Sequence, residues 1–191
     1  MDALLGIMSA FGLSASAGLN AYIPLLVVGV IAHYTDWIKL SSPYDLLANP
    51  WILILISVLL IIEMLADKIP AVNHINDIIQ TVIRPAAGAI LFAASAHAVT
   101  NIHPLLALAC GLLIGGSVHA VKSGAVRPAI TATTGGAGNI PVSIAEDVIA
   151  TLLSILSIVL PILVGVFLVL FAVLIFLWLR RRAKKSRSAY N

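Results

Sequence analysis

Long apolar stretches separated by short polar ones dominate the chain. A helix that crosses a membrane needs about 20 apolar residues, because each residue adds 1.5 Å and the hydrocarbon core is about 30 Å thick. Four stretches meet or approach that length and predict spans at residues 3–32, 51–66, 85–99 and 105–121. The first is long enough to tilt, or to bend at the segment SASAGLN.

The last apolar stretch, residues 142–179, is too long for one crossing. Its 38 residues would form a helix of about 57 Å, and only Glu146, Asp147 and Pro161 interrupt it. A division near Pro161 gives two ordinary spans, and six in total. The pattern predicts an all-α, polytopic transmembrane helical bundle in one domain, residues 1–179, followed by a basic tail, residues 180–191.

Two polar segments connect the early spans. Residues 33–50 carry Trp and Tyr at positions typical of a membrane interface, and they predict a loop. Residues 71–84 place apolar side chains at helical spacing, which predicts an amphipathic helix lying along the interface.

The composition makes lipid the solvent for much of the chain. Hydrophobic residues make up 61% of the 191 residues and charged residues 10%, and the mean hydropathy is +1.09. A soluble domain averages about one quarter charged residues. The single cysteine, Cys110, excludes an internal disulfide and a Cys-x-x-Cys site. The histidines match no metal-binding spacing, so we expect neither a metal nor another cofactor.

Charge sets the expected orientation in the membrane. Six of the eleven basic residues lie in the segment RRRAKKSR, which the positive-inside bias places in the cytoplasm. With six spans the N-terminus is cytoplasmic too, and Lys68, Arg84, Lys122 and Arg127 lie on that side, whereas five spans would put these four outside. No basic face exists elsewhere, which excludes a nucleic-acid partner.

Six spans would also allow a 3+3 inverted repeat, because the first and fourth spans then run in opposite directions. The segments FGLSASAGLNA and CGLLIGGSVHA share a glycine, small residues and a polar residue before the final alanine. Helices rich in small residues often show such similarity by chance, so both explanations stay open.

Polar side chains recur at helical spacing in three places, all in the cytoplasmic half of the predicted spans. An ionisable side chain at the centre of a membrane costs at least about 2.5 kcal/mol unless it faces protein, water or a partner. The three sets therefore predict a polar cavity open to the cytoplasm. They are Ser9, Ser16 and Asn20; Glu63 and Asp67, with Lys68 beside them; and Asn139, Ser143 and Glu146, with Asp147 beside them.

The segment TTGGAGN has a low helix propensity, because its glycines and threonines disfavour a continuous helix. Within a membrane, unwound backbone survives only where it is buried in protein or lines a wet cavity. A helix that begins after this segment would point its positive end into the cavity. The segment therefore predicts a broken or re-entrant element that forms one wall of a ligand site, through Thr133, Thr134, Gly135, Gly136 and Asn139.

Each of these features also has a plain structural explanation. Lys68, Arg84, Lys122 and Arg127 could serve only as topology anchors. Glu63 could simply pair with a neighbouring cation. The glycine-rich segment could be a site of close helix packing or an ordinary cytoplasmic loop. The basic tail could be a solvated anchor or could bind lipid headgroups.

The segments EMLADKIPAVNHINDIIQTVIRPAAGA and TATTGGAGNIPVSIAED resemble a bacterial membrane-protein family, with plant plastid relatives, known as domain of unknown function 4126. The similarity extends from GLSASAGLNAYIPLL to the last span. It implies an integral membrane domain, here of the bacterial cytoplasmic (inner) membrane. It supplies no activity and no catalytic residue.

The residues favour a small transporter or channel-like carrier, coupled to protons or sodium through Glu63 or Glu146. Its ligand would be a small ion, a solute or an anionic headgroup, and its partners the lipid bilayer and a second copy packed through the GLLIGG face. The alternatives are a non-transporting scaffold or assembly factor, and an intramembrane enzyme acting on a lipid headgroup, with His119 or an acid as base. The candidate binding residues are Asn20, Glu63, Asp67, Lys68, Arg84, Lys122, Arg127, Thr133, Thr134, Gly135, Gly136, Asn139, Ser143, Glu146 and Asp147.

Overall fold

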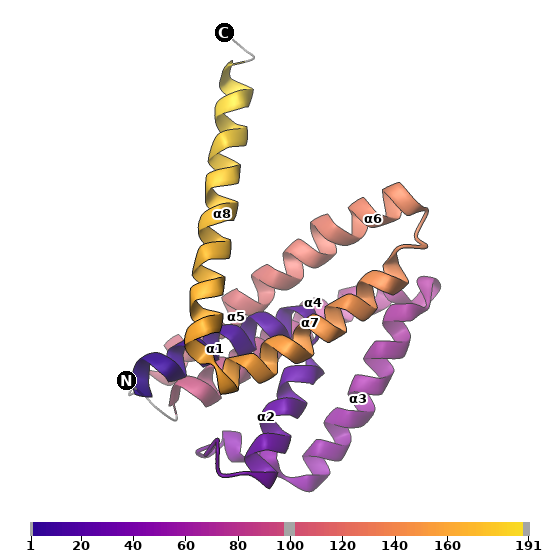
Figure 1. Cartoon of the computed structure of the whole chain (residues 1–191). Coiled ribbons are helices and arrows are strands. Elements are labelled where there is room, and N and C mark those ends of the chain that lie inside the picture. The colour runs from indigo at the N-terminus through magenta and orange to yellow at the C-terminus, as the bar shows by residue number, and fades with distance from the viewer. Residues whose placement is uncertain (1, 98–101, 189–191) are drawn as a thin grey trace.

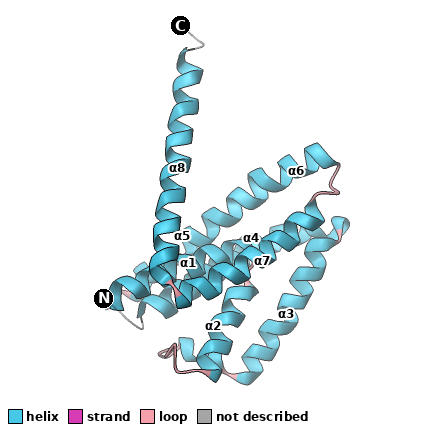
Figure 2. Ribbon diagram, viewed as in Figure 1, coloured by secondary structure: helices cyan, strands magenta, loops and turns pink. Residues whose placement is uncertain are grey.

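The structure is a computed structural model, and it describes residues 2–97 and 102–188 (Figure 1). Over these residues the chain consists of helices and connecting turns, without strands (Figure 2), which confirms the predicted all-α class. The helices are α1 (Asp2–Leu19), α2 (Tyr22–Tyr34), the 3-10 helix η1 (Tyr44–Ala48), α3 (Pro50–Lys68), α4 (Pro70–His97), α5 (Pro104–Val121), the π-helical turn η2 (Lys122–Val126), α6 (Arg127–Thr134), α7 (Asn139–Val159) and α8 (Pro161–Ser188).

Four helical segments in the described part are long and apolar enough to cross a membrane. Three shorter apolar helices accompany them, at Ala3–Leu19, Tyr22–Tyr34 and Pro161–Phe171. A polytopic membrane protein follows from this, whereas six crossings and the inverted repeat stay predictions. The four segments are Pro50–Lys68, Ile75–Ala96, Pro104–Thr134 and Asn139–Val159.

The first predicted span consists of two helices, which meet at the end of the segment SASAGLN, where the sequence allows for a bend. The side chain of Asn20 ends α1 and starts α2, since its Oδ1 accepts hydrogen bonds from the backbone N–H groups of Tyr22 and Ile23, both at 3.1 Å. Leu5, near the start of α1, and Trp37, just after α2, line the same pocket. The two helices therefore form a V, and its open ends lie on the same side of the bundle.

The predicted separate interfacial helix is wrong, because residues 71–84 belong to the continuous helix α4, with Pro85 inside it. Its apolar side chains face outward, with Ile78 63% and Val82 72% exposed. Its polar side chains Asn76, Gln80 and Arg84 face inward and are buried. The segment is amphipathic in the opposite sense from the expected one, with its polar side toward protein. Residues 98 and 99 of the predicted span lie outside the described residues.

Glycines bring α4 and α5 into close contact. A Cβ added at Gly88 would lie 2.7 Å from the carbonyl oxygen of Gly111, and one at Gly115 would lie 3.1 Å from the carbonyl oxygen of Arg84. Gly111 and Gly115 belong to the GLLIGG face that the sequence assigned to a dimer contact. This face packs within the chain, and the homodimer itself stays a prediction.

The break near Pro161 is where the sequence predicts it, because α7 ends at Val159 and α8 begins at Pro161. The first turns of α8 pack on α1, with Val164 buried and Gly165 against Met8. The helix then leaves the bundle and continues to Ser188, through most of the basic tail (Figure 1).

Candidate functional site

Nine charged side chains gather where the ends of α3 and α5 meet the starts of α4 and α7. They include five of the eight acidic residues of the chain and four of its eleven basic ones. Outside this charged cluster and the basic tail, the charged residues are only Asp2, Asp36, Lys39 and Asp45. The charged cluster consists of Glu63, Asp67, Lys68, Asp77, Arg84, Lys122, Arg127, Glu146 and Asp147.

Arg84 lies at the centre of the charged cluster and is fully buried. Its Nη2 and Nε donate to Oε1 of Glu63 at 2.9 and 3.3 Å. The same Nη2 lies 3.6 Å from Oδ2 of Asp67. Nη1 lies 3.3 Å from Nδ1 of His119. The planar, five-donor guanidinium can meet several acceptors at once, which a lysine could not do in this geometry.

Asp67 joins α3 to four other elements, α4, η2, α6 and α7. Its Oδ2 accepts from Nη2 of Arg127 at 2.8 Å and lies 3.7 Å from Nζ of Lys122. Its Oδ1 accepts from the amide of Asn76 on α4 at 2.7 Å, and Ser143 on α7 approaches at 3.5 Å. Glu63 and Asp67 lie one turn apart on α3 and share its buried face, as their spacing predicts.

A π-helical turn presents Lys122 and Arg127 to the same site. In a regular α-helix, side chains five residues apart would point about 140° away from each other. A π turn closes its hydrogen bonds between residues five apart, so that these two side chains lie on one face. Such turns often occur at functional sites.

Lys122 and Arg127 then connect α5 and α6 to the neighbouring helices. Nζ of Lys122 lies 2.8 Å from Oε2 of Glu146 and donates to the backbone carbonyl of Leu19 at 2.8 Å. That carbonyl belongs to the last residue of α1, where the helix dipole is negative. Nη1 of Arg127 lies 3.0 Å from Oδ1 of Asp77.

A second set of contacts binds the start of α7 to the break after α1. The Asn20 amide donates to Oδ1 of Asp147 at 3.0 Å, and Nζ of Lys68 lies 3.3 Å from Oδ2. The structure thus brings Asn20, Glu63, Asp67, Lys68, Arg84, Lys122, Arg127, Ser143, Glu146 and Asp147 together.

The charged cluster is closed in this structure. Glu63, Arg84 and Lys122 are 2%, 0% and 3% exposed, and only the side chains of Lys68 and Asp77 at the rim reach 28% and 18%. The sequence predicts that these side chains line an open cavity, whereas here they pair with one another.

The glycine-rich segment does not join the charged cluster. The chain is unwound at residues 135–138, as predicted, with positive φ at Gly135 and Gly136, but α6 continues to Thr134 and α7 starts at Asn139. The described polar contacts of the segment stay within the α6–α7 turn. Thr134 accepts from the N–H of Gly138, and Asn139 donates to Thr131. Thr133, Thr134 and Gly135 are exposed.

Three residues at the charged cluster, Asn76, Asp77 and Gln80, are not among those predicted from the sequence. Asn76 and Gln80 lie four and eight residues before Arg84 and form the buried polar face of α4 with it. That spacing is visible in the sequence, but periodicity alone does not tell whether the polar face of a helix meets water or protein.

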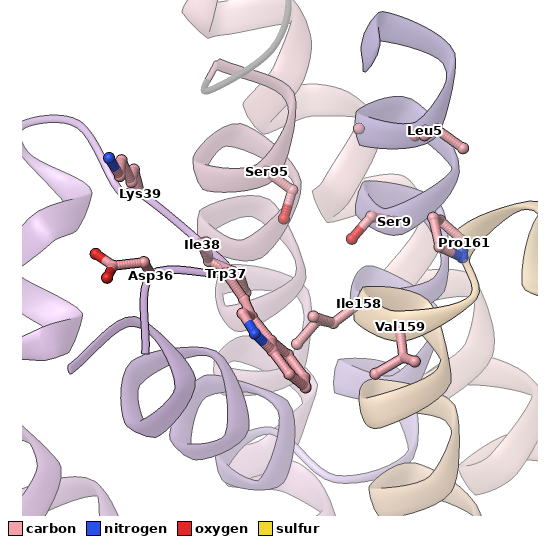
Figure 3. Close-up of a pocket in the computed structure, with 11 residues that line it drawn as sticks. Leu5, Ser9, Asp36, Trp37, Ile38, Lys39, Ser95, Ile158, Val159 and Pro161 are labelled. Carbon is pink, nitrogen blue, oxygen red and sulfur yellow. The ribbon is translucent and has the colours of Figure 1, made fainter. Parts of the chain in front are cut away.

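A pocket of about 550 Å³ lies at the other end of α1, α4 and α7 (Figure 3). Ser9 of α1 and Ser95 of α4 point their hydroxyls into the space between these helices, and the Trp37 ring extends toward Ile158 and Val159. An adjoining, almost wholly apolar pocket of about 520 Å³ shares Leu5, Val159 and Pro161 with it. This polar and apolar lining suits a small amphipathic or polar molecule.

Hydroxyl groups connect the two ends along the contact between α1 and α7. Ser16 and Ser154 are both fully buried, and their hydroxyls lie 2.8 Å apart. Ser157, also fully buried, lies against Gly12 of α1 toward the pocket, and the Asn20–Asp147 contact lies toward the charged cluster.

The part of the chain that the structure describes contains no group of three His, Cys, Asp or Glu side chains placed to hold a metal ion. The family model for the domain of unknown function DUF4126 matches residues 7–181. Neither the curated proteins nor the solved structures include one that matches this chain. The family match covers most of the sequence. The chain therefore belongs to the DUF4126 family of domains of unknown function.

Proposed function

We propose that the protein is a small membrane transporter or channel-like carrier in which the charged cluster is the gate and ion-binding site. The observation that carries this proposal is a cluster of nine charged side chains, seven of them buried, between helices of a membrane protein. Replacing a buried ion pair with apolar side chains is often neutral, or stabilising by about 1–4 kcal/mol. Ionisable residues within membrane helices therefore mark ion or solute pathways by default.

The two ends of the bundle suit a carrier that opens on one side at a time. The charged cluster is closed, while the pocket around Ser9 and Ser95 is open at the other end of the same helices. The buried hydroxyls of Ser16 and Ser154 lie between them. A small ion or polar solute that entered the pocket would reach the charged cluster along this contact.

Interrupted helices supply the elements that could move. The chain breaks after Asn20, takes a π turn at Lys122, and breaks again at Gly135. Asn20 at the first break donates to Asp147 of the charged cluster, and the π turn carries Lys122. Transporters commonly place their binding sites at discontinuous helices.

We place the charged cluster on the cytoplasmic side of the bacterial inner membrane. The argument rests on the basic tail, because Lys68, Arg84, Lys122 and Arg127 are paired with acids and say little about orientation. Helix α8 starts at the pocket end, so one crossing brings the tail to the cluster side. Helix α1 runs about 27 Å from the pocket to the cluster. Its first residues would then lie outside, unlike the cytoplasmic N-terminus that the sequence predicts.

Reconstitution of the purified full chain into liposomes tests transport. Ion flux is followed with a pH-sensitive dye and with a panel of radiolabelled cations, anions and small polar solutes. We expect flux above that of empty liposomes for at least one of them, and its loss in Asp67→Asn. Asp45→Asn, which alters an exposed carboxylate far from the charged cluster, is the matched control. Wild-type flux equal to that of empty liposomes for the whole panel would overturn the proposal.

One observation favours a non-transporting scaffold instead. Each of Lys68, Arg84, Lys122 and Arg127 has a carboxylate within 4 Å, as expected if the charges only hold helices together. A scaffold would lose stability with Asp67→Asn, and it would show no flux before or after the change.

A further inference from the structure

We propose that the ion bound at the charged cluster is a proton and that Glu63 carries it. This inference deepens the proposed function, because it names the coupling ion of the same site. It starts from a charge count. The five carboxylates of the charged cluster face four basic side chains, which leaves one negative charge in excess when all are ionised.

His119 cannot supply the missing positive charge in this geometry. Its Nδ1 lies 3.3 Å from Nη1 of Arg84, and a guanidinium only donates hydrogen bonds. Nδ1 must therefore be an acceptor, and an imidazole that accepts at one nitrogen is neutral. Its other nitrogen, Nε2, meets the hydroxyl of Thr81 at 3.2 Å.

The hydrogen bonds identify Glu63 as the carboxylate whose second oxygen can carry a proton. Both hydrogen bonds from Arg84 reach Oε1 of Glu63, and its Oε2 is buried without a hydrogen-bond partner among the described residues. The Oε1 atom of Gln80, one turn before Arg84 on α4, is another buried acceptor without a donor among the described residues. A buried acceptor that lacks a donor costs about 1–3 kcal/mol. A proton on Oε2 turns that oxygen into a donor.

The other carboxylates have less need of a proton. In Asp67 and Asp147 each oxygen already meets a donor. Oε2 of Glu146 and Oδ1 of Asp77 are also buried without a hydrogen-bond partner among the described residues, but each lies beside a cation, 2.8 Å from Nζ of Lys122 and 3.0 Å from Nη1 of Arg127. Oε2 of Glu63 meets no second donor among the described residues.

The groups that face Glu63 come from several helices. They are Tyr22 of α2, Asp67 of α3, Arg84 of α4 and Lys122 next to α5. With Glu63 protonated, four carboxylates balance four basic side chains, and the site is neutral in its closed form. Release of the proton leaves a carboxylate oxygen without a donor in a dry site, which favours the opening of the charged cluster to water.

Infrared spectroscopy of the purified full chain tests the assignment without any transport assay. We expect wild type at neutral pH to show the carbonyl stretch of a buried protonated carboxylic acid, which shifts in heavy water. The band should disappear in Glu63→Gln and remain in Asp45→Asn. A neutral Gln also replaces a protonated Glu well, so Glu63→Gln should keep the melting temperature of wild type. Absence of the band in wild type, or its survival in Glu63→Gln, would overturn the proposal.

A further measurement keeps the test decisive. If sodium, compared with choline, raised the melting temperature of wild type but not of Glu63→Gln, and no band were seen, the bound ion would be sodium. A band without flux would refute transport and leave the proton site standing. Flux without a band would support transport and refute the proton site.

Discussion

Lys122 shows at the scale of one residue how the charged cluster is held together. Its ammonium group is 3% exposed and meets both Glu146 and the carbonyl of Leu19. A buried charge that loses its partner is far more costly than a pair that is absent altogether. The residue is therefore a structural tie between α1, α5 and α7 as well as part of the proposed gate.

Replacing Lys122 with Met should destabilise the protein by about 3–5 kcal/mol, because Glu146 is left without its nearest cation. The double variant Lys122→Met/Glu146→Gln should recover a large part of that loss. Thermal unfolding in detergent measures both, with Lys39→Met, an exposed lysine, as control. Equal losses in the single and double variants would contradict a direct pair.

Gly136 offers a second prediction at this scale. Its φ of 93° lies in the region that other residues rarely adopt, so Gly136→Leu should cost about 1–2 kcal/mol through backbone strain. Because the turn makes no described contact with the charged cluster, flux per folded molecule should stay unchanged. Asn tolerates such backbone, and Gly136→Asn should be milder. Loss of flux at full stability would restore the ligand-wall hypothesis for this turn.

At the scale of elements, the sequence predicts correctly those features that depend only on the spacing of residues along the chain. The i, i+4 pair Glu63 and Asp67 and the break at Pro161 are where the pattern predicts them. The prediction of α4 failed because the polar face of an amphipathic helix was assumed to face water. The same periodicity fits a helix whose apolar face meets lipid and whose polar face meets protein. Only the partners of Arg84 show that the polar face meets protein and not water. The V of α1 and α2 depends on the Asn20 side chain, which no periodicity reveals.

The α4–α5 contact gives a test of packing. Gly88→Ala places a methyl group 2.7 Å from the Gly111 carbonyl oxygen, which cannot move without shifting the helix. We expect a loss of about 1–3 kcal/mol, as for overpacked cores. At Gly116 the same change meets only the Pro85 ring at 3.5 Å, an ordinary contact, and should be nearly neutral. Melting temperatures of the two variants compare them, and equal values would argue against the close approach.

At the scale of the whole molecule, the charged cluster and the pocket occupy opposite ends of one bundle. The sequence indicated most of the charged residues but not their closed arrangement, because periodicity gives the face of a helix and not its partner. The sequence does not indicate the pocket, because residues 36–39 come close to α1 only in the folded chain.

Cysteine labelling in a Cys110→Ala background tests the proposed orientation in cells. Ser42→Cys, in the loop before η1, should react with a membrane-impermeant reagent from outside. Ala3→Cys should do the same, because the start of α1 shares the pocket with residues 36–39. Ser188→Cys should react only after permeabilisation. Labelling of Ser188→Cys from outside would reverse the orientation.

The single residue Ile69 between α3 and α4 has a consequence for how the protein is made. Alone, each helix would enter lipid carrying ionised side chains, at about 2.5–3.5 kcal/mol for each one at the membrane centre. Because the connection is so short, Glu63 and Arg84 can pair as soon as both helices have left the ribosome. We therefore expect α3 and α4 to leave the translocon together as a hairpin, since neither is well suited to insert first.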